Sequence, residues 1–236
     1  AKEKELGELK TRFVSMASHE FRTPLATIMA AVETLRAYRH KLSEEKIDQR
    51  FDKIKIQIEH LKDIMEDVLM LSRMQARRVE FNPSKLNLDA MCRSVLDEFQ
   101  NRSDIGHEID YQAAEMPVLM LDRKLMRQVI NNLISNAIKY SPEAESIYVR
   151  LDYHDSQVVL TVRDEGIGIP ESDLTHLFEP FHRGENVGVI SGTGLGLVIL
   201  KESIDLHGGT IHVESQVGRG TTFTIQIPTT EVRQER

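Results

Sequence analysis

The first residues that could do chemistry lie near the N-terminus, where His19 is followed by Glu20 and, one helical turn later, by Thr23. Apolar residues recur around them at alternating steps of three and four, which predicts an amphipathic helix with His19 on its outward side. An exposed imidazole, with a pKa near ~6.5, is mostly neutral at pH 7 and can attack phosphorus. Glu20 could take or orient the ring proton. On its own, the segment is better explained as an incidental surface histidine on a helix that Pro24 bends.

A second group combines amide and cationic side chains. Asn132 and Asn136 are four residues apart in a helical pattern, so both amides should share one face, with Lys139 close to it. Amide oxygens are hard ligands that suit Mg²⁺, which usually keeps several waters and binds substrate phosphates. The alternative is a pair of surface asparagines on an amphipathic helix, which the low helix propensity of asparagine makes slightly less favourable.

Two glycine-rich segments could hold a ligand against backbone. Asp164, Gly166 and Gly168 follow a predicted strand, and the glycines would let the backbone approach a planar ligand closely. The carboxylate could accept a hydrogen bond from an exocyclic amine such as that of adenine, although a simple turn has the same pattern. The second segment opens a predicted helix, where free amides can bind phosphate. It consists of Gly192, Thr193, Gly194, Leu195, Gly196 and Leu197, and its spacing fits neither a Walker loop nor a Rossmann fingerprint.

A long segment between these two, residues 170–193, has little periodicity. A long loop inside a compact domain is often a functional lid. Its phenylalanines could close over a ligand or form a small core under the loop, and Arg183 could reach a phosphate.

These segments together closely resemble the conserved boxes of sensor histidine kinases. The H box corresponds to residues 18–25, the N box to residues 132–141, the first glycine box to residues 164–170, the F box to residues 177–183 and the second glycine box to residues 192–197. All five occur in the family's order, and the resemblance extends from about Leu9 to Ile227. Phe21 stands where many members carry leucine.

The resemblance implies a role for each matching residue. His19 would be the phosphorylated residue, with Glu20 assisting transfer and Thr23 implicated in dephosphorylating the partner. The remaining roles concern nucleotide: Asn132 and Asn136 would serve Mg²⁺ and the phosphates, Lys139 the phosphates, Tyr140 would pack beside the nucleotide, and Asp164 would read adenine. The family therefore implies ATP and Mg²⁺ as cofactors, and a response regulator receiver domain as the partner whose aspartate accepts the phosphoryl group.

The elements that must position these residues divide the sequence in two. Residues 1 to about 78 predict two long helices joined by a polar connection. Each helix carries an apolar stripe, and the stripe of the second helix consists of Phe51, Ile54, Ile58, Leu61, Met65 and Val68. A single hairpin cannot bury such stripes, so we expect a homodimer that forms a four-helix bundle. A breaker segment at residues 81–84 suggests a phosphotransfer domain at 1–79 and an ATP-binding domain at 80–236.

The second part mixes helical and strand patterns, which predicts an α/β sandwich with a mixed sheet. Helices are expected at residues 86–100, 122–140 and 195–207, and strands at 107–111, 118–121, 147–153, 158–163, 210–215 and 221–227. The resemblance implies the ATP-binding fold shared with gyrase, chaperone and mismatch-repair ATPases.

Composition limits the other possibilities. The 236 residues carry a net charge of −7 without a cluster of Lys and Arg, which argues against nucleic acid as a partner. The one cysteine, Cys92, excludes a disulfide within the chain and fits a reducing, cytoplasmic location for this portion. The sequence begins at Ala1, inside a helical pattern, so we expect a fragment whose upstream sensor domain is absent and whose parent protein could be membrane-anchored.

Two alternatives stay open at this point. One is a nucleotide-binding scaffold that transfers no phosphate, and the other is a general ATPase whose hairpin serves only to dimerise. The sequence does not identify the sensed signal or the cognate regulator, nor whether phosphorylation occurs within or between subunits.

Overall fold

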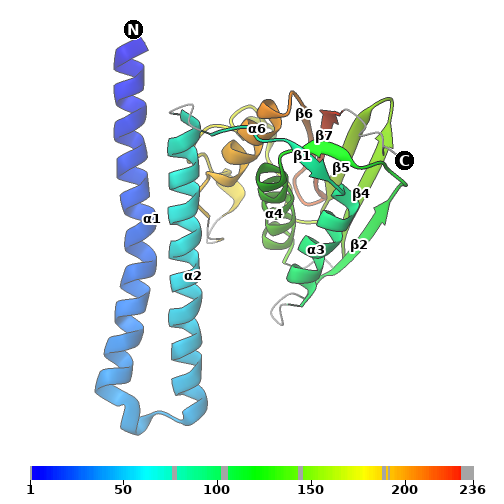
Figure 1. Cartoon of the computed structure of the whole chain (residues 1–236). Helices are drawn as coiled ribbons and strands as arrows, with labels where there is room; N and C mark the ends of the chain where they lie inside the picture. The colour runs from blue at the N-terminus through cyan, green and yellow to red at the C-terminus, as the bar shows by residue number, and fades with distance from the viewer. Residues whose placement is uncertain are drawn as a thin grey trace. The chain divides into compact units, whose positions relative to one another are not determined.

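The computed structural model describes residues 2–75, 79–101, 106–142, 146–187, 190 and 192–229, and these fall into two compact units, residues 1–76 and 77–236 (Figure 1). The first unit contains α1, η1 and α2, and the second contains all the other helices and strands of the described residues. The domain boundary expected between residues 79 and 80 stays a prediction.

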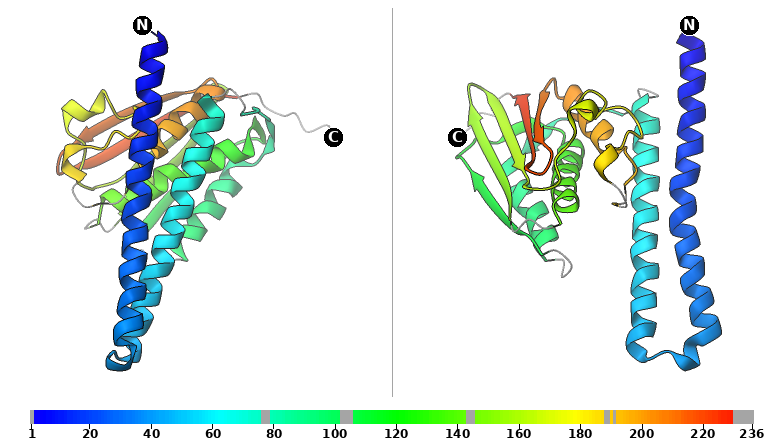
Figure 2. Two further views of the ribbon diagram at one scale, coloured as in Figure 1. Left: turned by 90° about the vertical axis from the view of Figure 1, so that its left-hand side faces the viewer. Right: turned by 180° about the vertical axis from the view of Figure 1, so that it is seen from behind.

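The first unit is a hairpin of two long helices. Helix α1 (Lys2–Tyr38) leads through a short 3-10 turn, η1 (Arg39–Lys41), into the antiparallel helix α2 (Glu44–Gln75) (Figures 1 and 2). Ser43 caps the start of α2, because its Oγ accepts a hydrogen bond from the Lys46 amide at 3.4 Å. Pro24 is buried and helix α1 continues through it. None of the described helices has the length and apolar character needed to cross a bilayer.

The stripe expected on α2 stays exposed or half-buried within this single hairpin, and other residues of α2 are buried. Ile64 and Leu71 are buried, whereas Phe51, Ile58 and Met65 are 55%, 54% and 50% exposed. Helix α2 is therefore apolar over an arc wider than the face that meets α1. Residues at steps of seven share one face of a helix, so these exposed side chains form a separate apolar strip.

The second unit contains a mixed sheet, as predicted. Its strand order is β2-β4-β5-β7-β6, in which β2 and β4 are parallel and the other pairs antiparallel. A separate antiparallel pair joins β1 to β3. The bounds are β1 (Ser84–Leu86), β2 (Glu108–Ala113), β3 (Leu119–Leu121), β4 (Ser146–His154), β5 (Gln157–Arg163), β6 (Thr210–Gln216) and β7 (Gly220–Pro228).

Three helices, α3 (Leu88–Gln100), α4 (Arg123–Tyr140) and α6 (Gly196–Leu206), cover one face of this sheet (Figure 2). Buried and exposed side chains alternate along β4 and β5, because only one face of the sheet meets the helices. Fully buried side chains such as Ile134 on α4 and Leu160 on β5 form the core between the layers. Each large side chain buried in this way stabilises the fold by about 1.5–3 kcal/mol.

The predicted elements otherwise agree with the structure to within two residues at each end. Strand β1 was missed, because the sequence reads as a breaker around Pro83 and three residues are too few for a periodicity signal. The expected loop at residues 170–193 contains a single helical turn, α5 (Glu171–Leu174), and a 3-10 turn, η2 (Glu185–Val187).

Candidate functional site

Helix α4 has a core face and a polar face. Asp122 caps its start by accepting hydrogen bonds from the Lys124 and Leu125 amides at 2.9 and 3.1 Å. Ile134 and Ala137 are buried in the core, while Asn132 and Asn136 are only half-buried, on the other side. The expected shared face of the two asparagines follows from this helical spacing.

Asn132 lies against the first residue of α6. A Cβ atom at Gly196 would lie 2.8 Å from the Asn132 Oδ1, so a larger residue there would displace the Asn132 side chain. The Asn132 Nδ2 is buried and donates to no acceptor among the described residues. Buried polar groups are normally satisfied, and the start of a helix has unbonded amides. This corner is therefore suited to a polar or anionic ligand.

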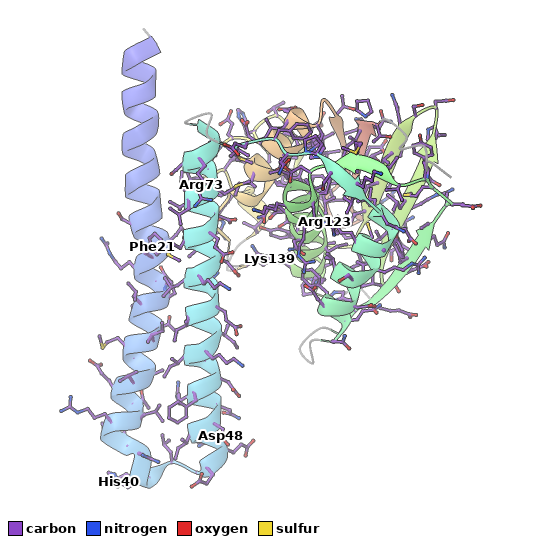
Figure 3. All side chains as sticks on the ribbon, in the orientation of Figure 1. Phe21, His40, Asp48, Arg73, Arg123 and Lys139 are labelled. Carbon is purple, nitrogen blue, oxygen red and sulfur yellow. The ribbon has the colours of Figure 1, made fainter. Side chains whose placement is uncertain are left out.

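The C-terminal end of α4 meets the second glycine segment. The Lys139 Nζ is 4.8 Å from the centre of the Tyr140 ring and lies beside the Gly192 backbone, where a Cβ atom would be 2.2 Å away (Figure 3). Burial raises the pKa of the Tyr140 hydroxyl, an effect that the nearby Arg183 charge partly offsets. A cation, an aromatic ring and half-buried glycine backbone thus lie together.

Asp164 follows β5 and is buried. Its Oδ1 accepts hydrogen bonds from the Gly166 amide at 2.9 Å and the Thr221 amide at 3.2 Å. Burial raises the pKa of this carboxyl, and the two amides partly counteract that shift. Within the described part of the chain no hydrogen bond to Oδ2 is formed, so this oxygen could accept one from a ligand.

The turn after Asp164 packs backbone against backbone. The Ile167 amide donates to the Tyr140 carbonyl at 2.9 Å, and a Cβ atom at Gly166 would lie 2.1 Å from the same oxygen. Gly168 has φ +65°, and a Cβ atom there would lie 2.1 Å from the Gln216 carbonyl oxygen. Close approach requires glycine at both positions, and at Gly168 the positive φ requires it as well.

The loop between the glycine segments is tied at its base. The Phe181 amide donates to the Gly194 carbonyl at 3.0 Å, and both residues have positive φ, +65° and +66°. The Arg183 Nη2 donates to the Ile190 carbonyl, while its buried Nε has no acceptor among the described atoms. The Thr193 Oγ1 accepts from the Leu195 amide at 3.1 Å.

The leucines of the second glycine segment belong to the core. Leu195 is fully buried and Leu197 packs against the core cluster. The Leu195 side chain is therefore unavailable to a ligand, and its amide already donates to the Thr193 Oγ1.

His19, Glu20 and Thr23 lie on α1, in the first unit. Glu20 is half-buried and Thr23 exposed, and the position of the His19 side chain is outside the described part of the structure. Thr23 lines a groove of about 520 Å³ on the hairpin. The groove is otherwise lined by small and cationic residues, namely Arg22, Ala26, Thr27, Ala30, Ala31, Thr34, Arg50 and Lys53.

Across the described ranges, no group of three or more His, Cys, Asp or Glu side chains could hold a metal ion. A metal at the polar face of α4 would therefore depend on amide oxygens and on the ligand's own phosphates. The half-buried amides of Asn132 and Asn136 fit the hard, incompletely protein-coordinated Mg²⁺ ion.

The sequence did not predict which residues of other segments fix the turn after Asp164. The Thr221 amide bonds the carboxylate, and the Asn186 Nδ2 donates to the Gly168 carbonyl at 2.8 Å. A Cβ atom at Gly220 would lie 2.0 Å from the Asp164 carbonyl oxygen. These residues are distant from Asp164 in sequence: the pairing of β5 with β7 brings Gly220 and Thr221 here, and Asn186 comes from η2.

Two family models match the chain. Residues 9–77 match the "His Kinase A (phospho-acceptor) domain", and residues 121–231 match the "Histidine kinase-, DNA gyrase B-, and HSP90-like ATPase". The chain is 31% identical over 241 residues to the sensor histidine kinase WalK of Bacillus subtilis, covering 99% of this chain and 39% of WalK. The chain thus spans well under half the length of that relative.

Solved structures agree. The histidine kinase AdeS of Acinetobacter baumannii has a TM-score of 0.69 at 27% identity, over 90% of this chain and 98% of that one. The histidine kinase ThkA, solved in complex with the response regulator protein TrrA, has a TM-score of 0.68 over 100% of this chain and 64% of that one, and at 23% identity it shows the shared fold.

We expect Gly166→Ala to weaken binding of a fluorescent ATP analogue by about tenfold or more, because the new methyl group would force the turn away from the Tyr140 carbonyl. Gly106→Ala is the matched control, since nothing lies within 4 Å of a Cβ atom there. Titration and thermal unfolding would be measured together. Equal affinity in the two variants would contradict the need for close approach.

Proposed function

Because the chain belongs to the sensor histidine kinases of two-component systems, we propose that it is an ATP-dependent protein-histidine kinase. It phosphorylates its own His19 and passes the phosphoryl group to an aspartate of a response regulator. The chain covers only part of its relatives, so these activities are proposed for this catalytic portion.

The observation that carries the nucleotide part of the proposal is the buried Asp164 carboxylate. Two backbone amides fix Oδ1, so the orientation of Oδ2 is set before any ligand binds. A carboxylate oxygen accepts hydrogen bonds only, which suits an exocyclic amine such as that of adenine. The glycine turn beside it leaves room for the flat base.

The phosphates would lie toward the polar face of α4. Asn132 and Asn136 would hold Mg²⁺, which when bound neutralises charge on the phosphate oxygens. Lys139 and Arg183 would contact phosphate oxygens, and Tyr140 would pack beside the nucleotide. The amides of residues 192–197 would add neutral donors at the start of α6.

In the transfer step, an imidazole nitrogen of His19 forms a bond to the γ-phosphorus as the bond to the β–γ bridging oxygen breaks. ADP leaves with that electron pair, and Glu20 takes or orients the ring proton. Positioning and charge neutralisation supply most of the rate in phosphoryl transfer. A receiver aspartate then attacks the same phosphorus and releases the imidazole.

The hairpin offers two different surfaces to partners. Leu25, Met29 and Val32 on α1 are exposed, as is the strip of Phe51, Ile58 and Met65 on α2. Contiguous exposed apolar surface commonly marks an interface, and a second copy would bury it in a four-helix bundle.

The groove beside Thr23, with Arg50 and Lys53, would receive the receiver domain, whose phosphorylation site is acidic.

Incubation with γ-labelled ATP and Mg²⁺ should place acid-labile label on the wild type and none on His19→Gln. Asn136→Ala should label roughly 10²-fold more slowly, because charge stabilisation by a positioned group is lost. Asn131→Ala, on the same helix, is the control and should remain within about twofold of the wild type. Nucleotide binding without label would favour a scaffold, and free phosphate without a phosphoprotein would favour a general ATPase.

Ile58→Lys should shift the dimer toward monomer by roughly 10²-fold in dissociation constant, because a charge cannot be buried unpaired in an apolar interface. Ile56→Lys is the control, since Ile56 is 59% exposed against 54% for Ile58 but points about 200° away around the helix. Sedimentation across a concentration series would measure both. Equal dissociation of the two variants would argue against this strip as the interface.

Thr23→Ala tests the proposed phosphatase role, in which Thr23 orients the water that attacks the phosphorylated receiver. We expect dephosphorylation of a receiver domain to slow by about tenfold, with autophosphorylation within about twofold of the wild type. Lys53→Glu should instead slow both transfer to the receiver and its dephosphorylation, because docking is weakened. Full phosphatase activity in Thr23→Ala would show that Thr23 does not orient the attacking water.

A further inference from the structure

The chain enters the second unit through residues 81–86, here called the connecting segment, and it is fastened there by polar contacts. The Asn82 amide donates to the Asp122 Oδ2 at 2.8 Å. The Phe81 ring packs edge-on against the His207 imidazole, with 4.9 Å between ring centres and an angle of 87° between the planes. Strand β1 then pairs with β3, Ser84 opposite Leu121.

Asp122 and His207 also join the two helices of the nucleotide site. The Asp122 amide donates to the His207 Nε2 at 3.1 Å, and the His207 Nδ1 donates to the Ser203 carbonyl at 2.7 Å. Asp122 starts α4, directly before Arg123 (labelled in Figure 3), and His207 ends α6. Both residues are buried.

This arrangement fixes the tautomer of His207. A carbonyl oxygen only accepts, so the Nδ1 carries the proton and the Nε2 is free to accept from Asp122. Burial lowers the pKa of the His207 imidazole, which favours this neutral form. One oxygen of Asp122 caps α4 while the other holds Asn82, so a single carboxylate joins helix and segment.

We infer that Asp122 and His207 are positioning residues that clamp the connecting segment to α4 and α6, so that the segment and these two helices of the nucleotide site move as one body. The inference rests on the proposed kinase activity, in which that unit must bring ATP to His19. Asn132 lies in the middle of α4 and Asn136 nearer its C-terminal end, and Gly196 is the first residue of α6. The orientation of these residues is thereby tied to the connecting segment.

The contacts of Asp122 and His207 with Phe81 and Asn82 are called the clamp below. We expect the clamp to affect the orientation of bound ATP and not the affinity for ATP. Its residues lie ten or more positions along each helix from the asparagines and from Gly196, so they do not form the nucleotide pocket. Loosening the clamp should therefore lower the rate at saturating ATP and leave ATP affinity unchanged.

Asp122→Asn is the sharpest variant, because asparagine is as good an N-cap as aspartate. Its remaining oxygen can still cap α4, but its amide would face the Asn82 N–H, so the contact with the segment is lost. Phe81→Ala removes the ring contact and cannot open the core, since Phe81 is 41% exposed. Asn87→Ala is the matched control: it removes the cap of α3, where Asn87 accepts from the Ala90 amide at 2.9 Å, and leaves the clamp intact.

The full chain would be studied by hydrogen exchange of peptides covering residues 79–88, by ATP titration and by autophosphorylation at saturating ATP. In Asp122→Asn and Phe81→Ala we expect exchange in the segment to rise by about tenfold. The labelling rate should fall several-fold and the dissociation constant for ATP should stay within about twofold. Asn87→Ala should lose a comparable amount of thermal stability and keep the labelling rate.

Unchanged exchange in Asp122→Asn would show that the clamp does not hold the segment. Faster exchange with an unchanged labelling rate would reduce the clamp to a structural contact and overturn the inference alone. A wild type that takes no label would overturn the kinase proposal together with it, so the two failures are distinguishable.

Discussion

The nucleotide site depends on backbone approaches that no side chain larger than hydrogen allows. The turn after β5 rests on the Tyr140 carbonyl through Gly166 and on the Gln216 carbonyl through Gly168, and Gly220 lies against the Asp164 carbonyl. These contacts hold the Asp164 carboxylate in place against the cost of its burial. Because the same turn bonds the C-terminal end of α4, the position of Asp164 and the position of Tyr140 are fixed together.

Helix α4 connects the turn after Asp164 to the core of the second unit. Its core face, with Leu133, Ile134 and Ala137 buried, prevents rotation about the helix axis, so Asn132 and Asn136 must face away from the core. Preorganised polar groups do not have to reorient when a charged ligand binds, which is the usual source of their large electrostatic effect. The tightly packed core is thus what allows half-buried amides to keep a fixed direction.

The sequence predicted most of the elements because their patterns are local. The amphipathic periods of α3, α4 and α6 and the alternation along β4 and β5 can each be read within a single segment. The family boxes drew attention to Asp164 and the glycines, but not to the partners that fix them. Thr221 and Asn186 act through a backbone amide and a single side-chain bond across distant segments, and such contacts leave no local pattern.

The sequence did not predict which apolar face of α2 meets α1. The second helix is apolar around more than one face, and the stripe that contains Phe51, Ile58 and Met65 was expected to be too much for a single hairpin to bury. The structure leaves these three side chains exposed, and it buries Ile64 and Leu71, which the stripe did not include. Periodicity identifies which side chains lie on a common face, but not which neighbour covers that face. In the proposed homodimer, α2 would contact both its own hairpin partner and a second copy, and an apolar arc of this width would supply a face for each.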